Sequence, residues 1–178
     1  LLRRQVGKLP DRRIQLYDKY LDTVLVHWVT ARSPGARTQG QQPIDTHRAT
    51  AYLIELAYWL QCNRPSGTAT RNDLHEALVN IYFGFGKLRQ EEATQEQMFA
   101  AQRDADTFLR DMRYFAGVIA ERGRDAFGFL HLTFQEYFVG RALARLKPHE
   151  RRKVLVGVLH QPRWREPILL CAGQLGII

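Results

Sequence analysis

The chain has 178 residues, 45% of them hydrophobic, and its nine Phe, seven Tyr and three Trp exclude a disordered protein. Lys and Arg outnumber Asp and Glu by 26 to 18, and the net charge of +8 favours anionic partners. No run of about 18 apolar residues is present, and the basic start Leu1-Leu2-Arg3-Arg4 has no apolar stretch behind it, so we expect neither a membrane span nor a signal peptide.

A first helix is predicted over residues 10–30, where apolar residues recur every three or four positions and Pro10 suits the first turn. Its apolar stripe consists of Ile14, Tyr17, Leu21, Val24, Leu25 and Trp28. Residues 31–48 are rich in Gly, Pro, Gln and Thr, which predicts a loop. A second helix is predicted over 49–62, with a stripe of Leu53, Leu56, Ala57 and Leu60.

The segment 63–67 interrupts this pattern, and a third helix is predicted to begin at Thr70. Thr70 would be its cap, Asp73 would lie in its first turn, and Gly84 and Gly86 would end it. Residues 87–103 are mostly polar, which is typical either of a loop or of the exposed first turns of the next helix. The apolar stripe of that helix covers about 104–116.

Two short apolar stretches, 117–120 and 126–131, flank a turn cluster and predict a β-hairpin. The next residues match the capping box S/T-x-x-E, so we expect Thr133 and Glu136 to cap the following helix. Pro148 opens a further predicted helix, a break follows at Gln161-Pro162, and a last helix is predicted from about Trp164 onward.

Helices followed by a hairpin predict a mainly α fold with a winged helix, that is, a helix-turn-helix with a small β-hairpin wing, flanked by helical segments. We divide the chain into three parts. Residues 1–48 form the end of a preceding helical domain and a loop, 49–146 the winged helix, and 147–178 the start of a helical domain. Two short helices at the end are compatible with a HEAT-like repeat, but they do not establish a period.

Several catalytic patterns are missing from the sequence. It has no G-x-x-x-x-G-K-[ST] phosphate loop, G-x-G-x-x-G, H-E-x-x-H or G-x-S-x-G, so we expect no catalytic residue, no metal site and no cofactor in this chain itself. Cys62 and Cys171 lie far apart in apolar patterns. They predict free buried thiols in a reducing, cytoplasmic compartment.

His131 is the candidate for ligand binding. It ends the second hairpin strand, two residues before Thr133, so it would lie beside the free N–H groups and the positive dipole end of a helix. An imidazole there can donate a hydrogen bond to an anion. The alternative is a half-buried structural histidine of the wing, and position alone leaves both open.

The stretch Phe127–Leu143, FGFLHLTFQEYFVGRAL, closely resembles the signature F-x-F-x-H-x-x-F-Q-E-Y/F-x-A of NACHT proteins. These are signalling ATPases that include bacterial defence proteins and animal NLR receptors. The stretch Leu9–Trp28 is similar to the segment that follows the NACHT nucleotide core. The chain departs from the signature at Val139-Gly140, where an Ala is usual, and this departure should affect packing only.

The resemblance implies that His131 contacts the β-phosphate of ADP and holds a closed, inactive form. The nucleotide core, with its phosphate loop, would precede residue 1, as the missing initiating Met also indicates. ATP or ADP with Mg²⁺ would then be the cofactor of the parent protein, and the core and neighbouring protomers of an oligomer would be the partners. Phe134, Gln135 and Tyr137 are expected to be core and interface positions.

The sequence thus predicts a regulatory fragment that senses the nucleotide state and controls oligomerisation in defence-related signalling. The alternative function is a winged helix that binds nucleic acid, which the net charge supports. In that case the helix from Thr70 to Phe83 would read bases through Arg71, Asn72 and His75. Neighbouring Asp73 and Glu76 would repel phosphates and weigh against it.

Overall fold

The computed structural model describes residues 13–31, 46–86, 88–114 and 117–177. In these ranges the α-helices are α2 (Arg13–Ala31), α3 (Thr46–Asn63), α4 (Arg71–Gly86), α5 (Gln95–Tyr114), α6 (Leu132–Arg145), α7 (Pro148–Val158) and α8 (Arg165–Gln174). The strands are β1 (Thr68–Ala69), β2 (Ile119–Gly123) and β3 (Ala126–Phe129), and two short 3-10 helices are η2 (Gln90–Glu92) and η3 (Pro162–Trp164). The predictions for Pro10 and for most of the loop over 31–48 lie outside the described residues.

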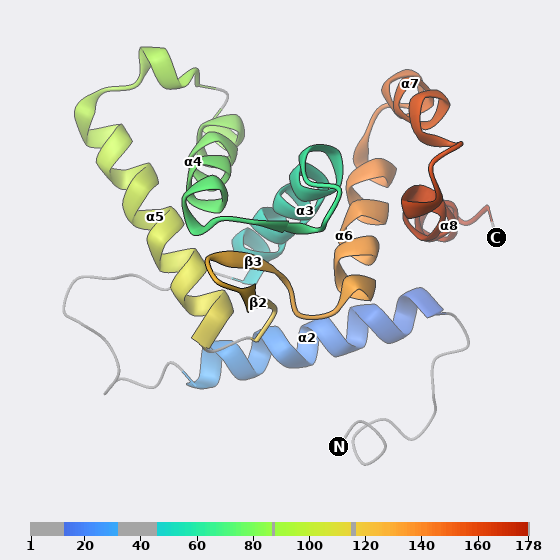
Figure 1. Cartoon of the computed structure of the whole chain (residues 1–178), viewed down its shortest axis with the longest axis horizontal. Helices are drawn as coiled ribbons and strands as arrows, with labels where there is room; N and C mark the ends of the chain where they lie inside the picture. The colour runs from blue at the N-terminus through green and yellow to red at the C-terminus, as the bar shows by residue number, and fades with distance from the viewer. Residues whose placement is uncertain (1–12, 32–45, 87, 115–116, 178) are drawn as a thin grey trace.

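The part from α3 to β3 is a winged helix. Its elements follow in the order α3, β1, α4, α5, β2, β3, and the strands form one antiparallel sheet in the order β1-β3-β2. Figure 1 shows α4 and α5 next to each other near the hairpin, α2 running across the base, and α6, α7 and α8 on the opposite side. The predicted fold class, mainly α with a hairpin wing, is therefore confirmed.

Strand β1 is missing from the sequence-based prediction, because two residues show no alternation of apolar and polar side chains. Thr68 pairs with Gly128 and Ala69 with Phe127. The pairing depends on the small residue in β3: a Cβ atom at Gly128 would lie 2.5 Å from the carbonyl oxygen of Gly67. A larger residue at position 128 would therefore push β1 away from β3.

One hydrophobic core joins the winged helix to the helices that flank it. Helix α6 packs against both α3 and α8. Leu21 of α2 belongs to this core, and so do Trp164, Leu170 and Cys171 from the C-terminal part. Residues of all three predicted domains thus share one core, and the division at 48 and 146 stays a prediction.

The two cysteines differ in their surroundings. Both thiols are free, Cys171 is buried in α8, and Cys62 is exposed in the last turn of α3. The prediction of a buried thiol is right for Cys171 and wrong for Cys62. Cys62 follows the buried Leu60 by two positions, which is about half a turn of the helix, so it lies on the side of α3 opposite Leu60.

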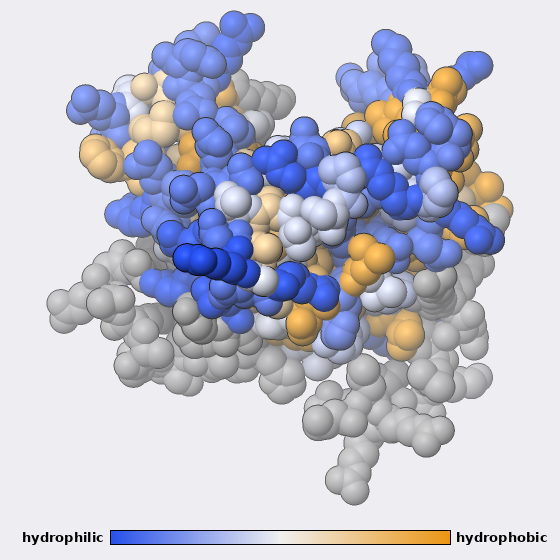
Figure 2. Space-filling view, viewed as in Figure 1, coloured by the Kyte–Doolittle hydropathy of each residue, from blue (hydrophilic) through white to orange (hydrophobic). Residues whose placement is uncertain are grey.

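The surface is hydrophilic over most of the face seen in Figure 2. Hydrophobic residues appear there around α7 and close to the first turn of α6. Around α7 the large exposed apolar side chains are Val156 and Leu159. In the part of the chain that the structure describes, no helix combines the length and apolar character needed to cross a bilayer.

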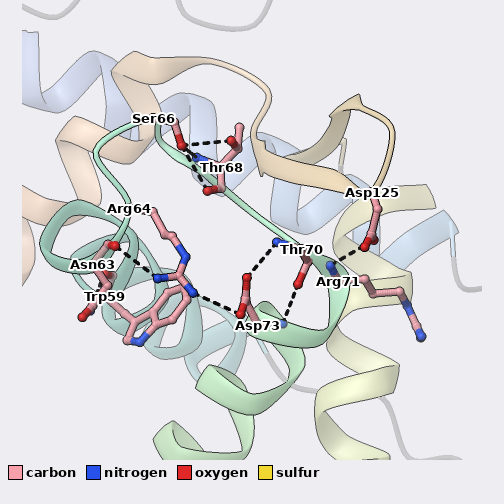
Figure 3. A network of polar contacts seen from close by, with 9 residues as sticks. All are labelled: Trp59, Asn63, Arg64, Ser66, Thr68, Thr70, Arg71, Asp73 and Asp125. Atoms are coloured by element: carbon pink, nitrogen blue, oxygen red, sulfur yellow. Dashed lines mark hydrogen bonds and ion pairs between the residues drawn. The ribbon is translucent and has the colours of Figure 1, made fainter.

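The predicted cap of α4 is confirmed (Figure 3). The N–H of Asp73 donates to Oγ1 of Thr70, the N–H of Thr70 donates to a carboxylate oxygen of Asp73, and both distances are 3.1 Å. The carboxylate of Asp73 also pairs with Arg64 at 3.0 Å. The N–H of Arg71 donates to Asp125 in the hairpin turn at 3.3 Å, so this network joins α3, α4 and the wing.

Helix α5 begins at Gln95, so from this residue on the second alternative for 87–103, the exposed first turns of the next helix, is the one that the structure shows. Thr94 and Gln97 cap it reciprocally: the N–H of Gln97 donates to Oγ1 of Thr94 at 3.2 Å, and the N–H of Thr94 donates to Oε1 of Gln97 at 2.8 Å. The polar segment 87–103 therefore contains both a connection and the first turns of a helix. The spacing T-x-x-Q is a sequence signal that locates this helix start.

Candidate functional site

His131 lies between the wing and α6. The N–H of Leu130 donates to the carbonyl oxygen of Val118 at 2.8 Å, so the pairing of the hairpin continues to residue 130. His131 has an extended backbone, with φ −121° and ψ 127°, and Leu132 is the first residue of α6. The N–H of Phe134 donates to the carbonyl oxygen of His131 at 3.0 Å. His131 therefore occupies the N-cap position of the helix.

The imidazole of His131 is exposed and makes no capping hydrogen bond. One side of the ring meets Phe134 edge to face, with 5.6 Å between the centroids. The neighbours Leu130 and Leu132 are also at the surface, with exposed fractions of 41% and 58%. His131 thus packs against Phe134 with one side of its ring while the residue as a whole is exposed, which favours ligand binding over the alternative of a half-buried structural histidine.

The start of α6 is suited to bind an anion. The side chain of its N-cap residue, His131, makes no hydrogen bond to the first turn. The first N–H groups of a helix have no partner inside the helix, and the macrodipole adds partial positive charge. An anion beside His131 can accept hydrogen bonds from the imidazole and from these N–H groups.

Thr133 and Glu136 do not form the predicted cap, which is a correction to the sequence analysis. Helix α6 begins at Leu132, so Thr133 is already a helical residue, and its side chain is exposed. A capping residue needs a non-helical backbone. Because the hairpin pairing reaches Leu130, only His131 remains to turn the chain into the helix, and the cap position falls before Thr133.

We expect Thr70→Ala to lower the free energy of unfolding by about 1 kcal/mol, because Oγ1 of Thr70 satisfies an N–H in the first turn of α4. Thr133→Ala is the matched control and should change it by less than about 0.5 kcal/mol, because Thr133 caps nothing. Urea unfolding followed by circular dichroism measures both values. Equal losses in the two variants would contradict this assignment of the caps.

Phe134 and Tyr137 attach α2 to α6. The ring of Phe134 stacks on Tyr20 with 4.9 Å between the centroids and meets Tyr17 edge-on at 6.3 Å. The hydroxyl of Tyr137 donates a hydrogen bond to Asp18, and burial together with this bond raises the pKa of Tyr137. Both residues are buried, as predicted for core and interface positions.

Gln135 connects α6 to α3 and to the C-terminal part inside the core. Its Nε2 donates to Oε1 of Gln61 at 3.1 Å, and Nε2 of Gln61 donates to the carbonyl oxygen of Arg163 at 2.9 Å. Both amides are buried. Hydrogen bonds between buried polar groups fix the geometry strongly, because a broken bond leaves a desolvated donor or acceptor.

The residues of the signature therefore divide into two groups. Phe134, Gln135 and Tyr137 point inward and join α6 to α2, α3 and η3, whereas His131 points outward. The exposed imidazole thus lies at the start of a helix, α6, that aromatic contacts and hydrogen bonds connect to α2, α3 and η3.

The structure also corrects the choice of recognition helix. In a helix-turn-helix the second helix enters the major groove of DNA. Here α4 is the first helix and α5 the second, so the helix from Thr70 is not the recognition helix. Its proposed base reader Arg71 is paired with Asp106 of α5 at 2.9 Å.

The family model of the winged helix-turn-helix domain C-terminal to NACHT matches residues 13–143. The matched range begins with α2 and ends within α6, so it includes the winged helix, the helix docked on it, and His131. Comparisons with curated proteins and with solved structures gave no match. Because the match covers well over half of the sequence, the chain belongs to the family of winged helix-turn-helix domains that lie C-terminal to NACHT.

Proposed function

We propose that this chain is the regulatory arm of a NACHT signalling ATPase, and that His131 reports which nucleotide the core of that protein holds. The observation that carries the proposal is the exposed imidazole of the N-cap residue of α6, which makes no capping hydrogen bond, in a domain whose family lies C-terminal to NACHT. ATP or ADP with Mg²⁺ would bind to the core. The arm itself would sense and regulate and would contribute no catalytic residue.

In the ADP state, His131 donates a hydrogen bond to the β-phosphate and holds the arm closed. Exchange of ADP for ATP removes this contact, the arm moves, and surfaces for association with neighbouring protomers become accessible. This is a two-state equilibrium that the γ-phosphate biases. A hydrogen bond to a charged group contributes about 1.5–3 kcal/mol, which corresponds to a change of roughly tens-fold in the equilibrium constant.

The surroundings of His131 support contact with a neighbouring domain. Leu130 and Leu132 flank it at the surface, and large exposed apolar residues beside a polar group are typical of interfaces. The aromatic contacts of Phe134 and the buried amide of Gln135 tie this surface to α2 and α3. Movement at the phosphate would therefore move the arm as one body. In the parent protein this movement would serve defence-related signalling.

The test is His131→Ala in the full-length parent protein. ADP should dissociate roughly tens-fold faster, and oligomers should form without a trigger, because the closed form loses its phosphate contact. Release of a fluorescent ADP analogue and light scattering measure the two effects. His149→Ala is the matched control, since His149 is an exposed histidine on α7, away from the start of α6. ADP release and an oligomer fraction at wild-type levels in His131→Ala would show that the clamp does not exist.

A further inference from the structure

A groove of about 600 Å³ lies beside α5, and its lining does not include His131. Buried apolar side chains form its floor. They come from α4, α5 and both strands of the hairpin: Leu74, Leu109, Ile119 and Phe127. The groove is therefore built by the elements of the winged helix itself, and a volume of this size accommodates one or two large side chains of a partner.

Arginines form the rim of the groove. Arg71, Arg103, Arg110 and Arg113 line it, and among the lining residues that the structure describes Asp106 is the one acidic residue. Arg71 is paired with Asp106, and Arg113 is paired with Glu121 at 2.7 Å. Arg103 is exposed and has no ion-pair partner among the described residues. A guanidinium group with free donors is suited to bind a carboxylate in a bidentate way.

Phe99 also lines this groove, and its side chain is 70% exposed. Phe99, Arg103, Asp106, Arg110 and Arg113 follow each other at intervals of three and four residues, so they share one face of α5. Exposed aromatic residues next to arginines are characteristic of the centres of protein–protein interfaces. The combination of an apolar floor, a basic rim and an exposed ring thus favours a protein ligand.

We propose that this groove binds an acidic segment of a partner protein. A large apolar side chain of the segment would pack on the floor, and a flanking carboxylate would pair with Arg103. A DNA duplex fits less well, because phosphate contacts make no use of the apolar floor formed by Leu74, Leu109, Ile119 and Phe127. This inference does not depend on nucleotide sensing at His131.

The experiment uses an array of short labelled peptides in which one leucine, phenylalanine or tryptophan stands among glutamates and aspartates. Fluorescence anisotropy then measures the affinity of the best peptides for the chain at physiological salt. Arg103→Glu should weaken binding about tenfold or more, and Phe99→Ser about fivefold. Both residues are exposed, so neither variant should impair folding. Arg152→Glu makes the same charge change at an exposed site on α7 and should weaken binding less than about twofold.

Control peptides with glutamine in place of the acidic residues, or with serine in place of the apolar residue, should lose the binding. The proposal is overturned if no peptide of the array binds, or if Arg103→Glu binds the peptides as tightly as the unmodified chain. A labelled DNA duplex of random sequence forms the second arm. Steeply salt-dependent duplex binding that Arg103→Glu abolishes, without peptide binding, would replace the proposal by a nucleic-acid interface.

Discussion

Replacing Trp164 by alanine should lower the free energy of unfolding by about 3–5 kcal/mol, because it removes a large side chain from the core. Trp164 is 2% exposed and meets Tyr58 of α3 edge-on, with 6.3 Å between the centroids. The carbonyl oxygen of the preceding residue, Arg163, accepts the hydrogen bond from Gln61. The loss should therefore destabilise α3 and α6 as well as the C-terminal helices.

Trp59→Ala is the matched control. Trp59 lies on α3, next to Tyr58, and is only partly buried beneath Arg64. Its replacement should therefore lower the free energy of unfolding by about 1 kcal/mol. Urea unfolding measures how much free energy of unfolding each variant loses, and native-state hydrogen exchange shows which helices are destabilised. If Trp164→Ala releases residues 148–174 while the winged helix keeps its stability, the C-terminal part is a separate domain, as the division at residue 146 predicts, and the expectation of one cooperative core is wrong.

The helix caps show which helix starts a local sequence pattern can predict and which it cannot. Thr70, Thr94 and Thr133 each begin a pattern with an acidic or amide side chain three residues later, and the first two cap their helices. Thr133 does not, because the pairing of Leu130 with Val118 fixes where the preceding strand ends. That pairing is a contact between strands, so spacing within one segment does not reveal it.

The position of His131 was predictable, and its exposure was not. The sequence places the imidazole at the junction of a strand and a helix. Whether the ring faces the core or solvent depends on α2, which covers the side of α6 that carries Phe134 and Tyr137. These contacts join residues that are more than a hundred positions apart, and helical periodicity contains no information about them.

The groove beside α5 could not be predicted from the sequence for the same reason. In the sequence, Arg71 is far from Arg103, Arg110 and Arg113, and all of them appear as scattered charges. The turn between α4 and α5 folds the two helices against each other, and the groove forms only where both meet the hairpin. The predicted recognition helix was wrong because α4 is the first helix of the helix-turn-helix and α5 the second, an order that follows from which helices pack together and not from the residues of α4 alone.

Gly140→Val should destabilise the protein by about 3 kcal/mol, because α6 and α8 approach each other too closely to admit a side chain. A Cβ atom at Gly140 would lie 2.8 Å from Cβ of Leu170 and 3.1 Å from the backbone nitrogen of Cys171. Neither atom can move away by rotation of a side chain, so α8 as a whole would have to shift.

Gly157→Val provides the control with the same change of side chain. Gly157 lies in α7, and a Cβ atom there would have nothing within 4 Å, so the variant should keep the stability of the unmodified chain or gain a few tenths of a kcal/mol from higher helix propensity. Urea unfolding of the two variants compares them directly. Equal stability of Gly140→Val and Gly157→Val would mean that α8 does not lie against α6 at this distance. The core that joins the winged helix to its C-terminal helices would then be looser than the structure shows.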